Sequence, residues 1–82
     1  MTYRYKTKGT CSSMIELELD GDVIKSVNFL GGCHGNLQGI SKLVQGMDAH
    51  KVISLLQGTK CGFKNTSCPD QLACALKKAL EQ

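Results

Sequence analysis

Apolar and polar side chains alternate along the first third of the chain, and a period of two residues predicts β-strands. Residues 14–19 alternate aliphatic side chains with glutamates, and residues 2–8 set two tyrosines against basic neighbours. Asp-Gly-Asp at residues 20–22 is typical of a hairpin turn, so residues 23–30 are expected to form the returning strand. The aliphatic and aromatic positions expected to face inward are Ile15, Leu17, Leu19, Val23, Val27 and Phe29. The prediction is a three-stranded antiparallel sheet with one apolar face.

The rest of the chain changes to helical spacing, with three candidate helices separated by glycines and polar residues. Asn36 is expected to cap the first helix, which Gly46 ends, and Asp48 is expected to cap the second, which Gly58 ends. Pro69 fits the first position of the third helix. The apolar positions expected to face inward are Leu37, Ile40, Leu43, Val44, Val52, Ile53, Leu55, Leu56, Leu72, Ala73, Leu76, Ala79 and Leu80. The predicted fold is therefore α+β, with three strands followed by three helices packed on one side of the sheet.

Length and charge narrow the range of functions. The 82 residues are expected to form one domain, residues 1–82, whose small core a bound metal would help to stabilise. The sequence has no apolar run of membrane length and no secretory signal, so we expect a cytoplasmic protein without a membrane partner. Its net charge of +3 comes from scattered lysines, and it has two tyrosines and two phenylalanines, which does not favour nucleic acid as a partner. The oligomeric state is left open.

Five cysteines are many for a chain of this length. In a reducing compartment, an odd number of cysteines argues against a disulfide framework. Three interpretations remain: the thiols bind a metal, they have a reactive or regulatory role, or they fill the core. Metal binding is our leading hypothesis, because four of the five cysteines lie where strands, loops and helices are expected to join.

The positions of these cysteines predict one shared site. Cys11 opens the second strand, and Cys33 lies in a glycine-rich connection between the last strand and the first helix. Cys61 follows the second helix, and Cys68 stands at the expected N-terminus of the third, where backbone N–H groups favour a thiolate. Cys74 lies within the third helix, turned away from its apolar stripe, and is expected to take no part. The sequence thus predicts one metal bound by the first four cysteines, although it contains no CxxC pair.

Four short segments resemble the TSCPD domain family. Residues 66–70 read Thr-Ser-Cys-Pro-Asp, and residues 9–12, 31–36 and 60–62 also look like cysteine-bearing segments of that family. The resemblance spans nearly the whole chain and implies metal binding, with zinc as the expected ion. The family includes small proteins and domains at the C-termini of adenosylcobalamin-dependent ribonucleotide reductases. The resemblance therefore implies an unidentified protein partner related to these reductases.

The order of strands, helices and cysteines also resembles the iron–sulfur cluster assembly scaffolds of the IscU/NifU N-terminal type. In that family, one cysteine opens a strand, one lies in a Gly-Cys-Gly loop and one begins the last helix, as Cys11, Cys33 and Cys68 are expected to do here. The aspartate that the scaffolds place two residues after their first cysteine is replaced by Ser13, and Cys61 offers a fourth thiolate. The combination indicates a closed site that retains zinc or, as the alternative, an iron–sulfur cluster.

Three functions are compatible with these residues. The first is a non-catalytic domain whose zinc has a structural or regulatory role, the second is an iron–sulfur carrier or scaffold, and the third is a thiol enzyme. In the enzyme, Cys68 would be the nucleophile and His34 the base, but no carboxylate that would orient the histidine is evident. His34 is also an alternative ligand beside Cys33, and His50 is expected to be a surface residue. We therefore expect a metal-binding domain rather than an enzyme.

Overall fold

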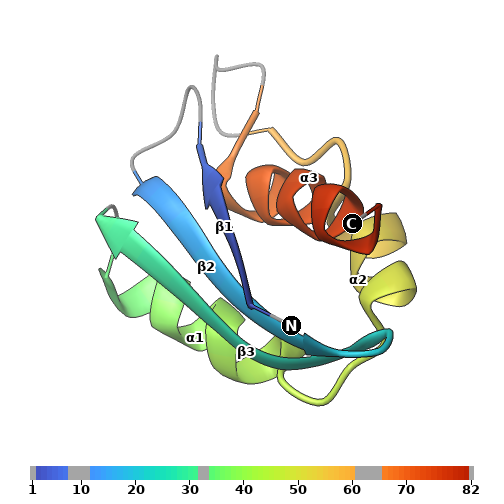
Figure 1. Ribbon diagram of the computed structural model, residues 1–82. Coiled ribbons are helices and arrows are strands. Elements are labelled where there is room, and N and C mark those ends of the chain that lie inside the picture. The colour runs from blue at the N-terminus through green and yellow to red at the C-terminus, as the bar shows by residue number, and fades with distance from the viewer. Residues whose placement is uncertain (1, 8–11, 32–33, 61–65, 82) are drawn as a thin grey trace.

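The computed structural model describes residues 2–7, 12–31, 34–60 and 66–81, and it has the predicted order of three strands and three helices. The elements are β1 (Thr2–Lys6), β2 (Ser12–Asp20), β3 (Val23–Gly31), α1 (His34–Val44), α2 (Ala49–Leu56) and α3 (Cys68–Leu80). Helix α1 packs along β3, α3 packs on β1 and β2, and α2 packs against α3 (Figure 1). The α+β prediction is therefore confirmed. Among the described helices, none combines the length and the hydropathy that crossing a membrane requires.

The sheet is antiparallel throughout, with β2 between β1 and β3. Its register places Tyr5 opposite Ile15 and Leu17 opposite Val27, so apolar side chains of neighbouring strands meet on the face that the helices cover. Gly21 has a φ of +61° at the first of the two turn residues between β2 and β3, where glycine has no steric cost. The hairpin that the Asp-Gly-Asp sequence predicts is confirmed.

The alternation along β2 produces the predicted buried face. Ile15, Leu17 and Leu19 are at most 3% exposed, and side chains from all three helices pack against them. The helix residues of this core are Val44, Ala49, Val52, Leu72, Ala75, Leu76 and Ala79. On the opposite face of the sheet, Arg4 Nε donates to Glu16 Oε2 at 2.8 Å. Polar side chains therefore face solvent on one side of the sheet, and the hydrophobic core fills the other.

The start of β3 departs from the predicted pattern. Val23 is 44% exposed, and Ile24 is the fully buried residue instead, so the prediction that Val23 faces inward is wrong. The register explains the difference: Leu19 pairs with Ile24, while the residue before Leu19 pairs with Ser26, which leaves one extra residue on β3. A bulge of this kind shifts the alternation by one position. Ile24 and Val27 therefore lie on the same face although they are three residues apart.

Helix α1 begins at His34, two residues before Asn36, so the predicted cap at Asn36 is wrong and the glycine-rich connection is shorter than expected. Leu37 and Val44 are buried, but Leu43 is 77% exposed. At about 100° per residue, Val44 returns close to the direction of Leu37, whereas Leu43 lies about 120° away from it. The helix buries one stripe against β3, and the inward prediction for Leu43 is wrong.

Asp48 caps α2 as predicted, because its carboxylate accepts a hydrogen bond from the N–H of His50 at 3.3 Å. The N–H of Ala49 donates to the carbonyl oxygen of Asp22 at 2.7 Å, which ties the start of α2 to the β2–β3 turn. Leu55 is 61% exposed, so the inward prediction for this residue is also wrong. The helix packs chiefly against α3, and the side that faces away from α3 stays in solvent.

Candidate functional site

Cys68 is the first residue of α3 and is half-buried, which confirms its predicted place at the N-terminus of that helix. Ser67 precedes it in an extended conformation, with φ −149° and ψ 171°, and the hydroxyl of Ser67 accepts a hydrogen bond from the N–H of Asp70 at 3.1 Å. This bond satisfies one of the N–H groups that a helix start leaves without a partner. Because Ser67 is the cap, the helix begins one residue before Pro69, which is the second helical residue rather than the first.

The carboxylate of Asp70 joins the end of α2 to the start of α3. Its Oδ1 accepts a hydrogen bond from the N–H of Gly58 at 2.7 Å, and its Oδ2 accepts one from the hydroxyl of Thr66. Gly58 has a φ of +85°, a conformation that glycine adopts readily and that ends α2. The amide of Gln71 donates to the oxygen of Thr66 at 3.0 Å. Thr66 is therefore held from two residues of α3.

A further bond fixes the segment that follows α2. The hydroxyl of Ser67 donates to the carbonyl oxygen of Thr59 at 2.7 Å. Within the five-residue segment 66–70, the side chains of Thr66, Ser67 and Asp70 build the turn, Pro69 lies in the first turn of the helix, and Cys68 carries the thiol. Sequence reasoning missed the capping role of Ser67. The available signal was a serine with an acidic residue three positions later.

The ends of the three strands lie next to one another near the start of α3. Ser12, the first residue of β2, pairs with Gly31, the last residue of β3. The N–H of Thr7 donates to the carbonyl oxygen of Ser13 at 3.2 Å, so the chain that leaves β1 also runs beside the start of β2. Figure 1 shows α3 beginning next to this end of β1. The described residues that are close in sequence to Cys11, Cys33 and Cys68 therefore lie at the same end of the sheet.

Cys68 lies within the described structure, whereas Cys11, Cys33 and Cys61 lie outside the described residues. The side chain of His34, at the first position of α1, is also outside the described part. The shared four-cysteine site stays a prediction.

The comparisons with known proteins identify the family. The family model of the TSCPD domain matches residues 1–80 of the 82-residue chain. The chain belongs to the TSCPD domain family. No curated protein and no solved structure matches it. In this TSCPD domain, the residues that spell the family's motif are those that shape the start of α3 around Cys68.

The second thiol that the structure describes in this TSCPD domain is Cys74, a half-buried free cysteine that faces β1. The hydroxyl of Tyr5 donates a hydrogen bond to its sulfur. Burial raises the pKa of Tyr5 above its usual value of 10.0, and the nearby Cys74, Tyr3 and Asp70 raise it further, because each would carry negative charge near the phenolate. Cys74 thus has a packing role between α3 and β1.

Another group of possible metal ligands lies at the opposite end of the sheet. Asp22, Asp48 and His50 each offer one ligand atom, and these atoms lie within 4.8 Å of one another. All three residues are exposed, and His50 Nε2 is 3.5 Å from Asp22 Oδ2. The prediction that His50 is a surface residue is confirmed. Exposed acidic groups of this kind are common without a bound ion, and among the described residues no buried polar side-chain atom lacks a hydrogen-bond partner.

Proposed function

We propose that this TSCPD domain binds one zinc ion through the thiolates of Cys11, Cys33, Cys61 and Cys68. The ion would have a structural or regulatory role, and the domain would not be an enzyme. One observation carries the proposal: described residues near the four cysteines are joined in two pairs, one by strand pairing and one by a hydrogen bond, and β1 packs against α3 between the two pairs.

Strand pairing supports a common position for the first two thiols. Cys11 directly precedes Ser12, and Cys33 follows Gly31 by two residues. Ser12 and Gly31 are partners in the β2–β3 ladder. Two residues of extended chain span at most about 7 Å. The described residues nearest to Cys11 and Cys33 in sequence are therefore neighbours in the sheet, which supports a shared site for these two thiols.

The cap of α3 supports the same conclusion for the other two thiols. Cys61 follows Thr59 by two residues, and Cys68 directly follows Ser67. The hydrogen bond of 2.7 Å between Ser67 and Thr59 places these two starting points side by side. The bond between Asp70 and the N–H of Gly58 reinforces that placement.

The link between the two pairs of cysteines is the contact between β1 and α3. Tyr5, near the end of β1, bonds to Cys74 and lies near Asp70, so the first turns of α3 adjoin that end of the strand. The chain beyond β1 in turn runs beside Ser13, which is two residues from Cys11 in sequence. The fold thus provides a physical reason for four cysteines without CxxC spacing to share one ion.

The chemistry of the site favours a closed metal centre. The N-terminal N–H groups of α3 carry partial positive charge, which stabilises a thiolate at Cys68. Four thiolates around Zn²⁺ have a net charge of about −2 and form the tetrahedral arrangement of structural zinc sites. The binding energy of such an ion adds to the folding energy of a small domain.

The hydrogen bonds of Asp70 support binding rather than thiol catalysis. Both oxygens of the one carboxylate near Cys68 in the described segment 66–81 are bonded, to Gly58 and Thr66. That carboxylate therefore has a structural role and does not orient a base. Because domains of this family occur at the C-termini of adenosylcobalamin-dependent ribonucleotide reductases, we propose a protein partner related to these enzymes and a cytoplasmic location.

The test is elemental analysis of protein purified without oxygen, repeated on the serine variants of all five cysteines. We expect one zinc per chain in the unchanged protein and in Cys74→Ser. Cys74→Ser is the matched control because the thiol of Cys74 accepts a hydrogen bond from Tyr5 and is not a proposed ligand. We expect the zinc to be lost in Cys11→Ser, Cys33→Ser, Cys61→Ser and Cys68→Ser. Circular dichroism on each variant separates loss of the ligand from loss of the fold.

Three results would contradict the proposal. Equal loss of zinc in all five variants would show that the ion follows folding and not these four thiols. Iron and sulfide with visible absorbance would assign the cysteines to an iron–sulfur centre. Rapid alkylation of Cys68 by iodoacetamide in the zinc-loaded protein would show that its thiolate is available to react, as in a thiol enzyme.

A further inference from the structure

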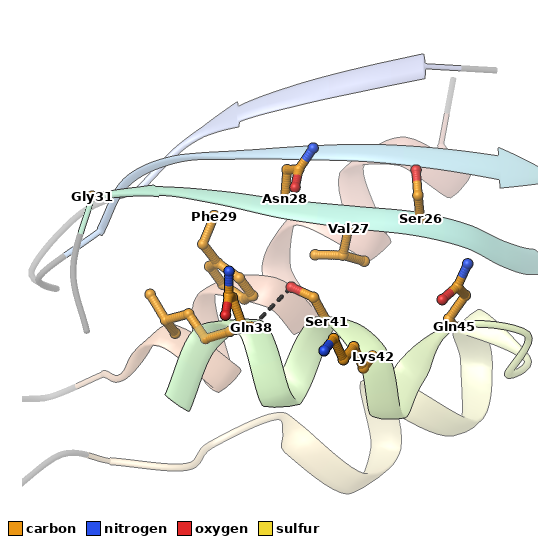
Figure 2. A pocket seen from close by; sticks show the side chains of 10 residues that line it. Ser26, Val27, Asn28, Phe29, Gly31, Gln38, Ser41, Lys42 and Gln45 are labelled. Atoms are coloured by element: carbon orange, nitrogen blue, oxygen red, sulfur yellow. Dashed lines mark hydrogen bonds between the residues drawn. The ribbon is translucent and has the colours of Figure 1, made fainter. Parts of the chain in front are cut away.

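A groove of about 300 Å³ runs between β3 and α1, and neither Cys68 nor Cys74, the two described cysteines, lines it. Figure 2 shows its two walls: the edge of β3 near Val27 and Phe29, and one side of α1. On the helix wall, the buried Leu37 lies at the base, and the polar side chains are those of Gln38, Ser41, Lys42 and Gln45. Of these, Gln38, Ser41 and Gln45 point toward the strand (Figure 2).

The β3 wall of the groove is an edge of the sheet. Only β2 pairs with β3 in the described sheet, because the strand order is β1-β2-β3. On the outer side of β3, two backbone hydrogen bonds involve Ile24. Its N–H donates to the carbonyl oxygen of Met47, and its carbonyl oxygen accepts from the N–H of Gly46. Further along, residues 26–29 and Gly31 of β3 line the groove. Edges of this kind pair with extended chains, whose main-chain groups continue the ladder.

The helix wall of the groove is polar and carries one charge. Its four polar side chains follow the spacing i, i+3, i+4 and i+7, which places them in one stripe along α1 and the residue that directly follows it, Gln45. Lys42 is the one ionic side chain among the residues that line the groove. The glutamates on the neighbouring strand β2 lie on the opposite, solvent-exposed face of the sheet, where Glu16 pairs with Arg4. The stripe therefore offers amide and hydroxyl groups and a single cation.

We propose that this groove binds an extended, acidic peptide segment of a partner protein. The segment pairs with β3 as a fourth strand, and its carboxylates meet Lys42. Charge complementarity selects this occupant over a second copy of the chain, because edge-to-edge pairing of two β3 strands would bring two copies of the Lys42 stripe together. The polar wall also favours a peptide backbone, with its many N–H and C=O groups, over an apolar helix.

The test uses a fluorescein-labelled peptide of eight residues that alternates valine with threonine and has glutamate at both ends. We expect saturable binding by fluorescence anisotropy, with amide chemical-shift changes confined to β3 and α1. A peptide with lysine in place of glutamate, and one with N-methyl groups on alternate backbone amides, should each bind at least about tenfold more weakly. The lysine peptide lacks the negative charge that would attract Lys42. The N-methylated peptide lacks backbone N–H groups that would pair with β3.

Two variants locate the binding site. Ser41→Trp fills the groove from the half-buried position on α1 and should lower affinity by about tenfold or more. Its matched control is Ser54→Trp on α2, since both serines donate to a backbone carbonyl of the preceding turn. Lys42→Glu, at an exposed position that leaves the fold undisturbed, should reverse the preference so that the lysine peptide binds better. Because Lys42→Glu changes only an exposed charge, it tests the proposal even if Ser41→Trp disturbs the packing of α1.

Four outcomes would overturn the proposal. They are no saturable binding up to about 1 mM, equal binding of the N-methylated peptide, shift changes outside β3 and α1, or an unchanged preference in Lys42→Glu. A dimer in sedimentation velocity that Ser41→Trp dissociates would assign the edge to self-association instead. None of these measurements depends on bound zinc, so they succeed or fail separately from the proposed function.

Discussion

Replacing Asp70 tests whether the hydrogen bonds around Cys68 hold the folded structure together without any metal. Asp70→Ala removes both bonds, from the N–H of Gly58 and from the hydroxyl of Thr66. Asp70→Asn keeps a group of the same shape, whose oxygen can accept from Gly58 and whose amide can donate to Thr66, but it removes the charge. The two variants therefore separate the bonds from the charge.

The expected magnitudes follow from these contacts. Hydrogen bonds to a charged group contribute about 1.5–3 kcal/mol each and neutral ones about 0.5–1.5 kcal/mol. Because Asp70 is half-buried and not fully buried, we take the lower ends of both ranges. Asp70→Ala should then lower the free energy of unfolding by about 3 kcal/mol. Asp70→Asn should lower it by about 2 kcal/mol, which is the difference between two hydrogen bonds to a charged group and two neutral ones.

The assay is urea denaturation of reduced protein with a chelator present, so that no metal contributes to stability. With an m value of about 1 kcal/mol per molar for a domain of this size, the midpoints should fall by about 3 M in Asp70→Ala and about 2 M in Asp70→Asn. The matched control is Asp20→Ala, which removes the same charge at an exposed position of the β2–β3 hairpin. Its effect should stay within about 0.5 kcal/mol.

One result would refute this reasoning: midpoints for Asp70→Ala and Asp20→Ala that agree within error. In that case the bonds between the end of α2 and the start of α3 would add nothing to stability. A double-mutant cycle with Thr66→Val supplies an independent check. It should give a coupling energy of about 1 kcal/mol between Thr66 and Asp70.

Two other stability predictions follow from the same region. Ser67→Ala removes the cap of α3 and the bond to Thr59, so it should lower the free energy of unfolding by about 1–2 kcal/mol in urea denaturation. Ser54→Ala on α2 should have almost no effect, and equal effects would contradict the capping role. Tyr5 has a raised pKa in the folded protein, so its contribution is fully present below about pH 10 and is lost as the pH rises through the folded pKa. Stability measured from about pH 8 to 11 should fall less steeply in Tyr5→Phe than in the unchanged protein, and parallel curves would contradict this assignment.

Local patterns predicted most of the secondary structure. The alternation of β2, the turn at Gly21 and the Asp48 cap each depend on a few adjacent residues, and all three are confirmed. The predictions for Val23 and Leu43 are wrong for a different reason. An inserted residue in β3 and the direction in which α1 meets the sheet decide which side chains are buried, and neither is a local property.

For the candidate site, too, the sequence predicted the local features and not the contacts between elements. The position of Cys68 at a helix start could be predicted, because a proline and an acidic residue follow it. The bonds that join Asp70 to Gly58 and Ser67 to Thr59 could not, because each links α3 to the end of α2 across a turn of unknown path. The groove along β3 had no signal in the sequence at all, since its two walls come from different elements.

The sequence alone determined the family, the α+β order of elements and the placement of four cysteines at the predicted ends of these elements. These depend on residue type and short-range spacing, which the chain carries before it folds. Only the tertiary structure decided that Ser12 pairs with Gly31 and that Thr59 bonds to Ser67. Such contacts arise only when strands pair and helices pack. They bring together described residues that are close in sequence to cysteines far apart along the chain.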